Sequence, residues 1–232
     1  MLLMSMNKEE LTAQIAEDFL QIKQYTDLRT QLIRDRVYRK GERHICDTWR
    51  SKNNNEWTLM VDVDKGTDAM LTFFTTINTK YGRFVFKPQV TNHGFILLAY
   101  IPHFFKRYRE RMKMGTKLTT MQLIRKYFRR NGNATEDYRG KGRIEISSAD
   151  GVCLGNIVSL RIRLLRTFIT RDMAYGDQEE RFATQEAFRK KVIEGSPIYG
   201  DEVHNELREF GLSEADLMVK WKEYFEEKQI KE

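Results

Sequence analysis

The chain has 232 residues, of which 41% are hydrophobic and 12% aromatic, so it can fold around a hydrophobic core without disulfides or metals. Its two cysteines, Cys46 and Cys153, are too few for the disulfide scaffold of a secreted protein. No apolar run approaches the roughly 20 residues that span a bilayer, and the N-terminus lacks the basic region of a signal peptide, so we expect a cytoplasmic protein with no membrane partner.

The net charge is +7, and the positive charge is concentrated in the middle of the chain. Residues 101–171 contain 17 Lys and Arg against 5 Asp and Glu, whereas residues 172–232 contain 9 against 16. This asymmetry is typical of a surface for nucleic acid or another polyanion. A solvated basic face neutralised by the acidic C-terminal part would give the same composition. We predict a nucleic-acid partner, RNA rather than DNA, and leave self-association of the acidic tail with the basic face as an alternative.

The predicted elements begin with a helix over residues 8–38, where apolar residues recur every three or four positions from Leu11 to Ile33. Gly41 ends this helix. Five strands are predicted after it, at residues 44–50, 56–64, 68–77, 83–90 and 95–100. Because short turns connect them, they indicate an antiparallel meander or half barrel.

Two helices are predicted next, at residues 102–112 and 119–130, and Pro102 occupies the favoured first turn. The following strands are predicted at residues 143–148 and 152–170, the second with a bulge or bend where its alternation breaks at Leu164 and Leu165. The remaining predicted helices are at residues 178–193, 202–210 and 213–227.

These elements define an α+β fold with one or more antiparallel sheets, a long N-terminal helix, two central helices and a helical C-terminal appendage. The composition changes from basic to acidic near Arg171. We therefore expect an α+β core of residues 1–171, with its basic segment at 101–171, and an acidic helical appendage of residues 172–232.

The first central helix contains the clearest candidates for chemistry. His103, Arg107 and Arg111 are spaced by four residues and form one stripe beside the apolar stripe of Phe104 and Tyr108. Imidazole can act as a general acid or base near neutral pH, and guanidinium groups bind phosphate and stabilise its extra charge. Such a site could cleave RNA without a metal, because the 2′-hydroxyl supplies the nucleophile. The alternative is a histidine without a chemical role beside solvated arginines.

The pattern H-x-x-x-R-x-x-x-R at a helix start resembles the active-site helix of the barnase/EndoU/colicin/RelE-like RNase-toxin superfamily. The later segment Thr167-Phe168-Ile169-Thr170 also resembles that group, in which a Thr or Ser on a late strand often helps to hold the phosphate. The resemblance covers residues 95–171 and implies a metal-independent ribonuclease. The catalytic residues that it implies are His103, Arg107, Arg111, Thr167 and Thr170.

A second set of candidates consists of basic residues that could contact the backbone of a nucleic acid. They are Lys106, Arg109, Arg125, Lys126, Arg129, Arg130, Arg139, Lys141 and Arg143. In the second central helix, Tyr127 and Phe128 lie between the cations and could stack on bases. Ordinary amphipathic packing would instead bury both rings in the core, and the cations could contact phosphates in either case.

Other clusters are weaker. His44, Cys46 and Asp47 could donate to a metal, and Asp62 and Asp64 share a strand face that could bind a cation, but ordinary strand alternation explains both groups. No Walker loop, dinucleotide glycine fingerprint, G-x-S-x-G elbow or H-E-x-x-H is present, so we predict no cofactor and no metal.

The sequence therefore leaves three functions open. The first is a metal-independent ribonuclease with a His/Arg/Arg site. The second is a non-catalytic nucleic-acid-binding module that uses the same basic surface. The third is a structural or assembly protein of a mobile element.

Overall fold

The structure is a computed structural model that describes residues 1–3, 5–40, 44–63, 69–91, 94–132, 135–176, 178–184 and 187. The chain divides into a compact unit from Met1 to Glu186 and a second unit from Ala187 to Glu232. The first unit contains all the elements below. The predicted helices at 202–210 and 213–227, and most of the one at 178–193, lie outside the described residues, although residues 178–184 are helical.

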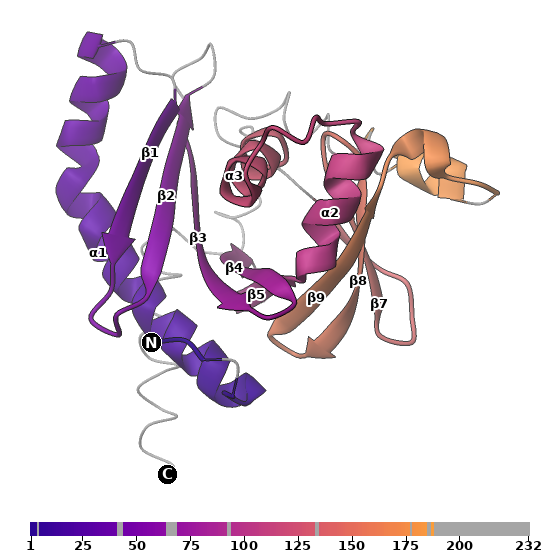
Figure 1. Cartoon of the computed structure of the whole chain (residues 1–232), viewed down its shortest axis with the longest axis horizontal. Coiled ribbons are helices and arrows are strands. Elements are labelled where there is room, and N and C mark those ends of the chain that lie inside the picture. Colours follow the sequence, from indigo (N-terminus) through magenta and orange to yellow (C-terminus); the bar gives the residue numbers. More distant parts are fainter. Residues whose placement is uncertain are drawn as a thin grey trace, which may run out of the picture. The chain divides into compact units, whose positions relative to one another are not determined.

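The described strands form one nine-stranded sheet in the order β1-β2-β3-β4-β5-β9-β8-β7-β6. They are β1 His44–Arg50, β2 Glu56–Val63, β3 Ala69–Thr79, β4 Gly82–Thr91, β5 Gly94–Tyr100, β6 Thr135–Tyr138, β7 Arg143–Ser147, β8 Val152–Ser159 and β9 Ile162–Ile169. Neighbouring strands pair antiparallel except β5 and β9, which are parallel. The sheet and its helices confirm the α+β class, and β1–β5 form the predicted meander (Figure 1).

The described helices are α1 Lys8–Lys40, α2 Pro102–Arg111 and α3 Thr120–Arg130, with a short 3₁₀ turn, η1, at Arg171–Met173. Pro102 occupies the first turn of α2, as predicted. Thr119 caps α3 by accepting a hydrogen bond from the Gln122 backbone N–H at 3.2 Å, and the Gln122 side chain accepts one from the Thr119 N–H at 2.8 Å. These local signals place both central helices within a residue or two of their predicted bounds.

The two faces of the sheet are covered by different helices. Phe74 points to the core that β3 shares with α2 and α3, and its ring lies 4.9 Å from that of Phe128. The neighbouring residue Phe73 points to the other face, where its ring lies 5.2 Å from that of Phe19 on α1. Phe128 and Tyr127 are both buried, so the core interpretation of these rings is confirmed over base stacking.

The prediction of a single strand over residues 152–170 is wrong. The chain forms two antiparallel strands, β8 and β9, joined by a two-residue turn at Leu160 and Arg161. This turn contains none of the Gly, Pro, Asn or Asp residues that usually mark a hairpin, and the Ser159 hydroxyl supports it by accepting from the Arg161 N–H at 3.3 Å. Short β6 was also missed, because its four residues are too few for a periodic signal.

The predicted bulge is present, one residue from the expected break. Leu154 pairs with Thr167 and Gly155 with Leu165, which leaves Arg166 without a partner residue in the ladder. A Cβ at Gly155 would collide with the backbone carbonyl of Leu164, so glycine permits the two strands to approach at this point.

Candidate nucleic-acid interface

The predicted stripe of α2 lies at the surface because its neighbours are buried. Phe104 and Tyr108 are fully buried, which leaves His103 exposed and Arg107 half-exposed beside them. The His103 Nε2 atom accepts a hydrogen bond from Arg107 Nε at 2.9 Å. Since an arginine remains protonated, this contact makes Nε2 the acceptor and leaves the ring proton on Nδ1. Arg107 also forms an ion pair with Glu110 at 3.0 Å.

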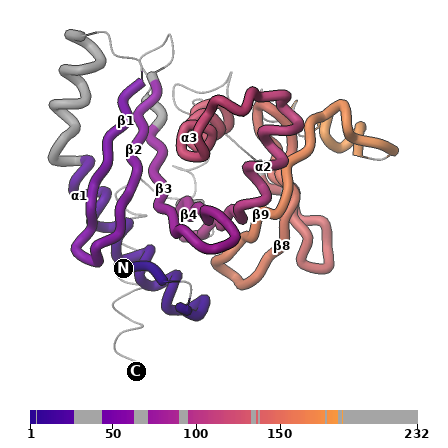
Figure 2. Tube along the Cα trace, viewed as in Figure 1, coloured from indigo at the N-terminus to yellow at the C-terminus, as the bar shows by residue number. Residues whose placement is uncertain are grey.

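Arg111 connects this stripe to β9. Strand β5 ends at Tyr100, so no described strand lies beside the edge of β9 beyond Leu165 on that side. Arg111 Nη1 donates to the backbone carbonyl of Phe168 and to Thr167 Oγ1, the latter at 3.2 Å. Burial and the nearby positive charge of Arg107 lower the pKa of Arg111. Figure 2 shows α2 and β9 next to each other, although the chain between them passes through α3 and three strands.

Four of the five predicted catalytic residues therefore form a row: His103 contacts Arg107, Arg111 lies one helical turn further along α2, and Arg111 contacts Thr167. Thr170 does not join them. It lies after the end of β9, where it precedes η1 and makes no capping hydrogen bond through its side chain.

The predicted phosphate-contacting residues differ in whether the protein already engages their side chains. Some have partners within the protein: Arg109 donates to the Leu118 carbonyl at 2.7 Å, Arg129 pairs with Asp62 at 3.1 Å, Arg130 with Asp150 at 2.5 Å and Arg139 with Glu145 at 2.7 Å. Lys106, Lys126, Lys141 and Arg143 are exposed. Arg125 is partly buried, and its Nε has no hydrogen-bond partner among the described residues.

Asp62 contacts both a histidine and an arginine. Its Oδ1 atom contacts His44 Nδ1 at 2.7 Å and Arg129 Nε at 3.1 Å. Asp64, which shares the predicted strand face with Asp62 and could have bound a cation with it, lies outside the described residues. In the part of the chain that the structure describes, no three His, Cys, Asp or Glu side chains are placed to hold a metal ion.

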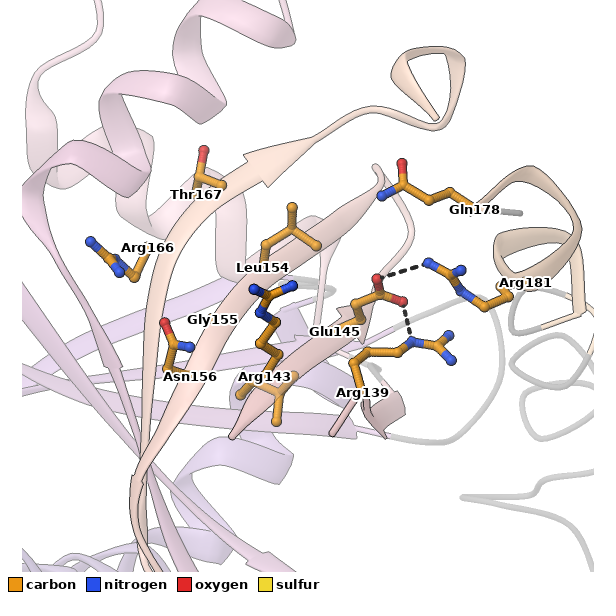
Figure 3. Close-up of a pocket in the computed structure, with 11 residues that line it drawn as sticks. Arg139, Arg143, Glu145, Leu154, Gly155, Asn156, Arg166, Thr167, Gln178 and Arg181 are labelled. Atoms are coloured by element: carbon orange, nitrogen blue, oxygen red, sulfur yellow. Dashed lines mark hydrogen bonds and ion pairs between the residues drawn. The ribbon is translucent and has the colours of Figure 1, made fainter. Parts of the chain in front are cut away.

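An open groove of about 710 Å³ lies along β7, β8 and β9 and ends at the helical residues 178–184. The side chains that Figure 3 labels around it include Arg139, Arg143, Arg166 and Arg181, with Glu145, Leu154, Asn156, Thr167 and Gln178 between them. We call this the arginine groove. Its lining contains four arginines and one carboxylate, so it carries a net positive charge.

The four arginines are not equivalent. Glu145 is buried, and its carboxylate lies 2.7 Å from Arg139 Nε and 3.3 Å from an Arg181 terminal nitrogen (Figure 3). The side chains of Arg143 and Arg166, in contrast, form no hydrogen bond or ion pair with any described residue. The alternation of β7 places Arg143 on the face opposite Ile144, which is in the core, and the bulge in β9 directs Arg166 outward.

Thr167 lies where the two features meet. Its hydroxyl accepts from Arg111, and the residue also lines the arginine groove. The row that begins at His103 therefore ends at the wall of this groove.

Sequence reasoning missed five polar or charged residues of the groove: Glu145, Asn156, Arg166, Gln178 and Arg181. The break in alternation at Leu164 and Leu165 was the signal for Arg166, because a bulge commonly redirects a side chain. Gln178 and Arg181 were assigned to an appendage, although Phe182 of the same helical segment packs in a core cluster with Val152 and Ile169.

The comparisons add no relative. No protein-family model matches the chain, and no curated protein and no solved structure matches it either. None of the described helices is long and apolar enough to cross a membrane.

Proposed function

We propose that this chain binds nucleic acid through the arginine groove and that RNA is its preferred ligand. The observation that carries the proposal is the pair of guanidinium groups of Arg143 and Arg166, which have no partner among the described residues, in a groove with a net positive charge. A guanidinium group left free at a protein surface can bind a phosphate through two parallel hydrogen bonds. The preference for RNA rests on the sequence resemblance to RNase toxins.

Exposed cations on α2 extend the same charge beyond the groove. Lys106 is exposed on α2, and Arg107 is half-exposed on the stripe that leads to Thr167. A phosphate backbone that follows the groove past Thr167 would therefore meet further positive charge. Phosphate contacts of this kind position a nucleic acid and provide most of its nonspecific affinity.

The double variant Arg143→Gln/Arg166→Gln should weaken the binding of single-stranded RNA about tenfold or more at low salt, because each guanidinium–phosphate contact is charge-assisted. It should also flatten the plot of log affinity against log salt by about 1.4 units, since each phosphate contact with a single strand contributes about 0.7. Fluorescence anisotropy over a series of salt concentrations measures both quantities.

The matched control is Lys52→Gln/Lys80→Gln. It removes the same charge from exposed turns of the β1–β5 meander, outside the groove. An equal loss of affinity in this control, or an unchanged salt slope in the arginine variant, would refute the assignment of the groove.

A specific observation favours a second function, metal-independent RNA cleavage. His103 is exposed, is held by Arg107, and belongs to the row that reaches the groove at Thr167. In this reaction His103 would take the proton of a ribose 2′-hydroxyl while O2′ attacks phosphorus. The 5′-oxygen would leave and take a proton from water. Arg107 must first release the Nε2 atom, because that atom is the base.

Purified protein should then cleave labelled RNA in excess chelator, and His103→Ala should reduce the rate by about 10²–10⁴. His44→Ala is the control, because His44 is engaged by Asp62 and lies outside the row. Cleavage that persists in His103→Ala, or that needs an added metal, would rule out this site. Binding without cleavage would leave the nucleic-acid-binding module as the function.

A further inference from the structure

We infer that the arginine groove accepts one unpaired nucleotide, with its base over Leu154 and its phosphate at Arg143 and Arg166, so that the ligand is single-stranded nucleic acid. The inference rests on the proposed function and defines its substrate class. Two observations support it: the volume of the groove, and the presence of Leu154, Asn156 and Gln178, whose side chains carry no charge to attract a phosphate.

The volume of the groove suits a ligand of the size of one nucleotide. Its volume of about 710 Å³ lies within the range of roughly 300–1,000 Å³ that is typical of small-molecule sites. The bases of a duplex are paired and stacked, so a base can enter such a site only from a single strand or after it is flipped out. Phosphate contact alone would not require a groove of this volume.

The centre of the groove offers an apolar surface. Figure 3 shows Leu154 between two groups of polar side chains, with Asn156 and Arg166 on one side and Gln178 and Arg181 on the other. Leu154 packs against a small core cluster of β8, β9 and Phe182, so its position is fixed from below. The face of a base can lie on such a surface. All the bases have an apolar face, so this contact does not depend on which base is bound.

Two amides lie where the edge of that base would be. Neither the Asn156 side chain nor the Gln178 side chain forms a hydrogen bond with another described residue. Each amide has a carbonyl acceptor and an NH₂ donor, which match the mixed donors and acceptors on a base edge. Glu145 is already held by Arg139 and Arg181, so its charge is compensated within the protein.

The first test compares three ligands by anisotropy at one salt concentration: a short mixed-sequence RNA, the same RNA paired with its complement, and polyglutamate. We expect the single strand to bind about tenfold more tightly than the duplex, since burial of a base face on Leu154 together with hydrogen bonds to its edge accounts for about that factor. Equal affinity for the duplex would overturn the inference. Equal affinity for polyglutamate would show that only charge is recognised and would also overturn it.

The second test uses the variant Asn156→Ala/Gln178→Ala, with Leu160→Ala as the control, because Leu160 is 93% exposed at the β8–β9 turn. The amide variant should lower affinity for the single strand about threefold to tenfold and leave duplex binding and the salt slope unchanged. Leu154→Ala should act similarly, after its melting temperature confirms that it folds. If only the arginine variant reduces binding, the proposed function stands and this inference fails. If the arginine variant also has no effect, both fail.

Discussion

Asp150→Asn should lower the free energy of unfolding at pH 7 by about 3 kcal/mol, because it disrupts a buried charged network. The Asp150 carboxylate accepts hydrogen bonds from Tyr108 at 2.6 Å, from Asn131 at 2.9 Å and from two nitrogens of Arg130 at 2.5–2.9 Å. Its side chain is only 4% exposed. The network joins α2, the C-terminal end of α3 and the turn between β7 and β8, so its loss should weaken the attachment of both helices to the sheet.

The effect depends on pH with a definite sign. Burial alone would raise the pKa of Asp150, but the hydrogen bonds from Arg130, Tyr108 and Asn131 and the charge of Arg130 outweigh it, so the pKa is lowered. The stabilisation by Asp150 is therefore present above the unfolded pKa of about 4 and is lost as the pH falls through the lower folded value.

Urea denaturation at pH 7 and at acid pH measures this prediction. Asp150→Asn should be less stable than the wild-type chain at pH 7, and the difference should shrink at acid pH. Asp172→Asn, which neutralises an exposed carboxylate, is the control and should change stability by no more than about 0.5 kcal/mol. A variant as stable as the wild type at pH 7 would show that this network does not hold the helices to the sheet.

Lys87→Met should stabilise the protein at pH 7 by up to about 3 kcal/mol, because it removes a partly buried cation that packs against the core. Lys87 on β4 pairs with Leu98, so it points to the face that α2 and α3 cover, and its Nζ lies 5.9 Å from the centre of the Phe128 ring. Burial lowers the pKa of Lys87 to about 8, although the nearby Cys153 acts in the opposite direction.

The pH range in which stability should increase follows from the pKa values of Lys87 and Cys153. The unfolded chain binds the Lys87 proton more tightly than the folded chain does, so stability should increase as the pH rises above about 8. Burial raises the pKa of Cys153 to about 12, so this thiol destabilises the fold once the unfolded thiol ionises near pH 9. The two contributions oppose each other above that value, and we expect the increase only between about pH 8 and pH 9.

Chemical denaturation at pH 7, 8 and 9 measures the free energy of unfolding and tests this prediction. The wild-type chain should gain stability from pH 8 to pH 9, and Lys87→Met should not. Lys117→Met, at an exposed position between α2 and α3, should behave as the wild type does. Destabilisation by Lys87→Met at pH 7 would mean that the ammonium has a partner that favours its charge.

The stripe on α2 shows how far sequence reasoning reaches. The spacing of His103, Arg107 and Arg111 beside Phe104 and Tyr108 was sufficient to place the cations at the surface and the rings in the core. The same helical periodicity placed Tyr127 and Phe128 inside. It could not show that Arg111 would donate to the free edge of β9, because that edge exists only once β5 ends beside it.

The arginine groove was beyond such reasoning for a related reason. Arg143 was a candidate because it is basic, but the sequence did not distinguish it from Arg129 or Arg130, whose partners Asp62 and Asp150 are far away in the chain. Which cation remains free depends on which carboxylate lies beside it after folding. Arg166 also needed the bulge that Gly155 permits.

By itself, the sequence determined the α+β class, the β1–β5 meander, both central helices and the concentration of charge in residues 101–171. Those features depend on local periodicity, on caps and turns, and on composition, which neighbouring residues encode. Only the tertiary structure decided the parallel pairing of β5 with β9, the partners of each arginine and the groove that Arg143 and Arg166 share with Gln178. These depend on contacts between residues distant in the chain, which no local pattern encodes.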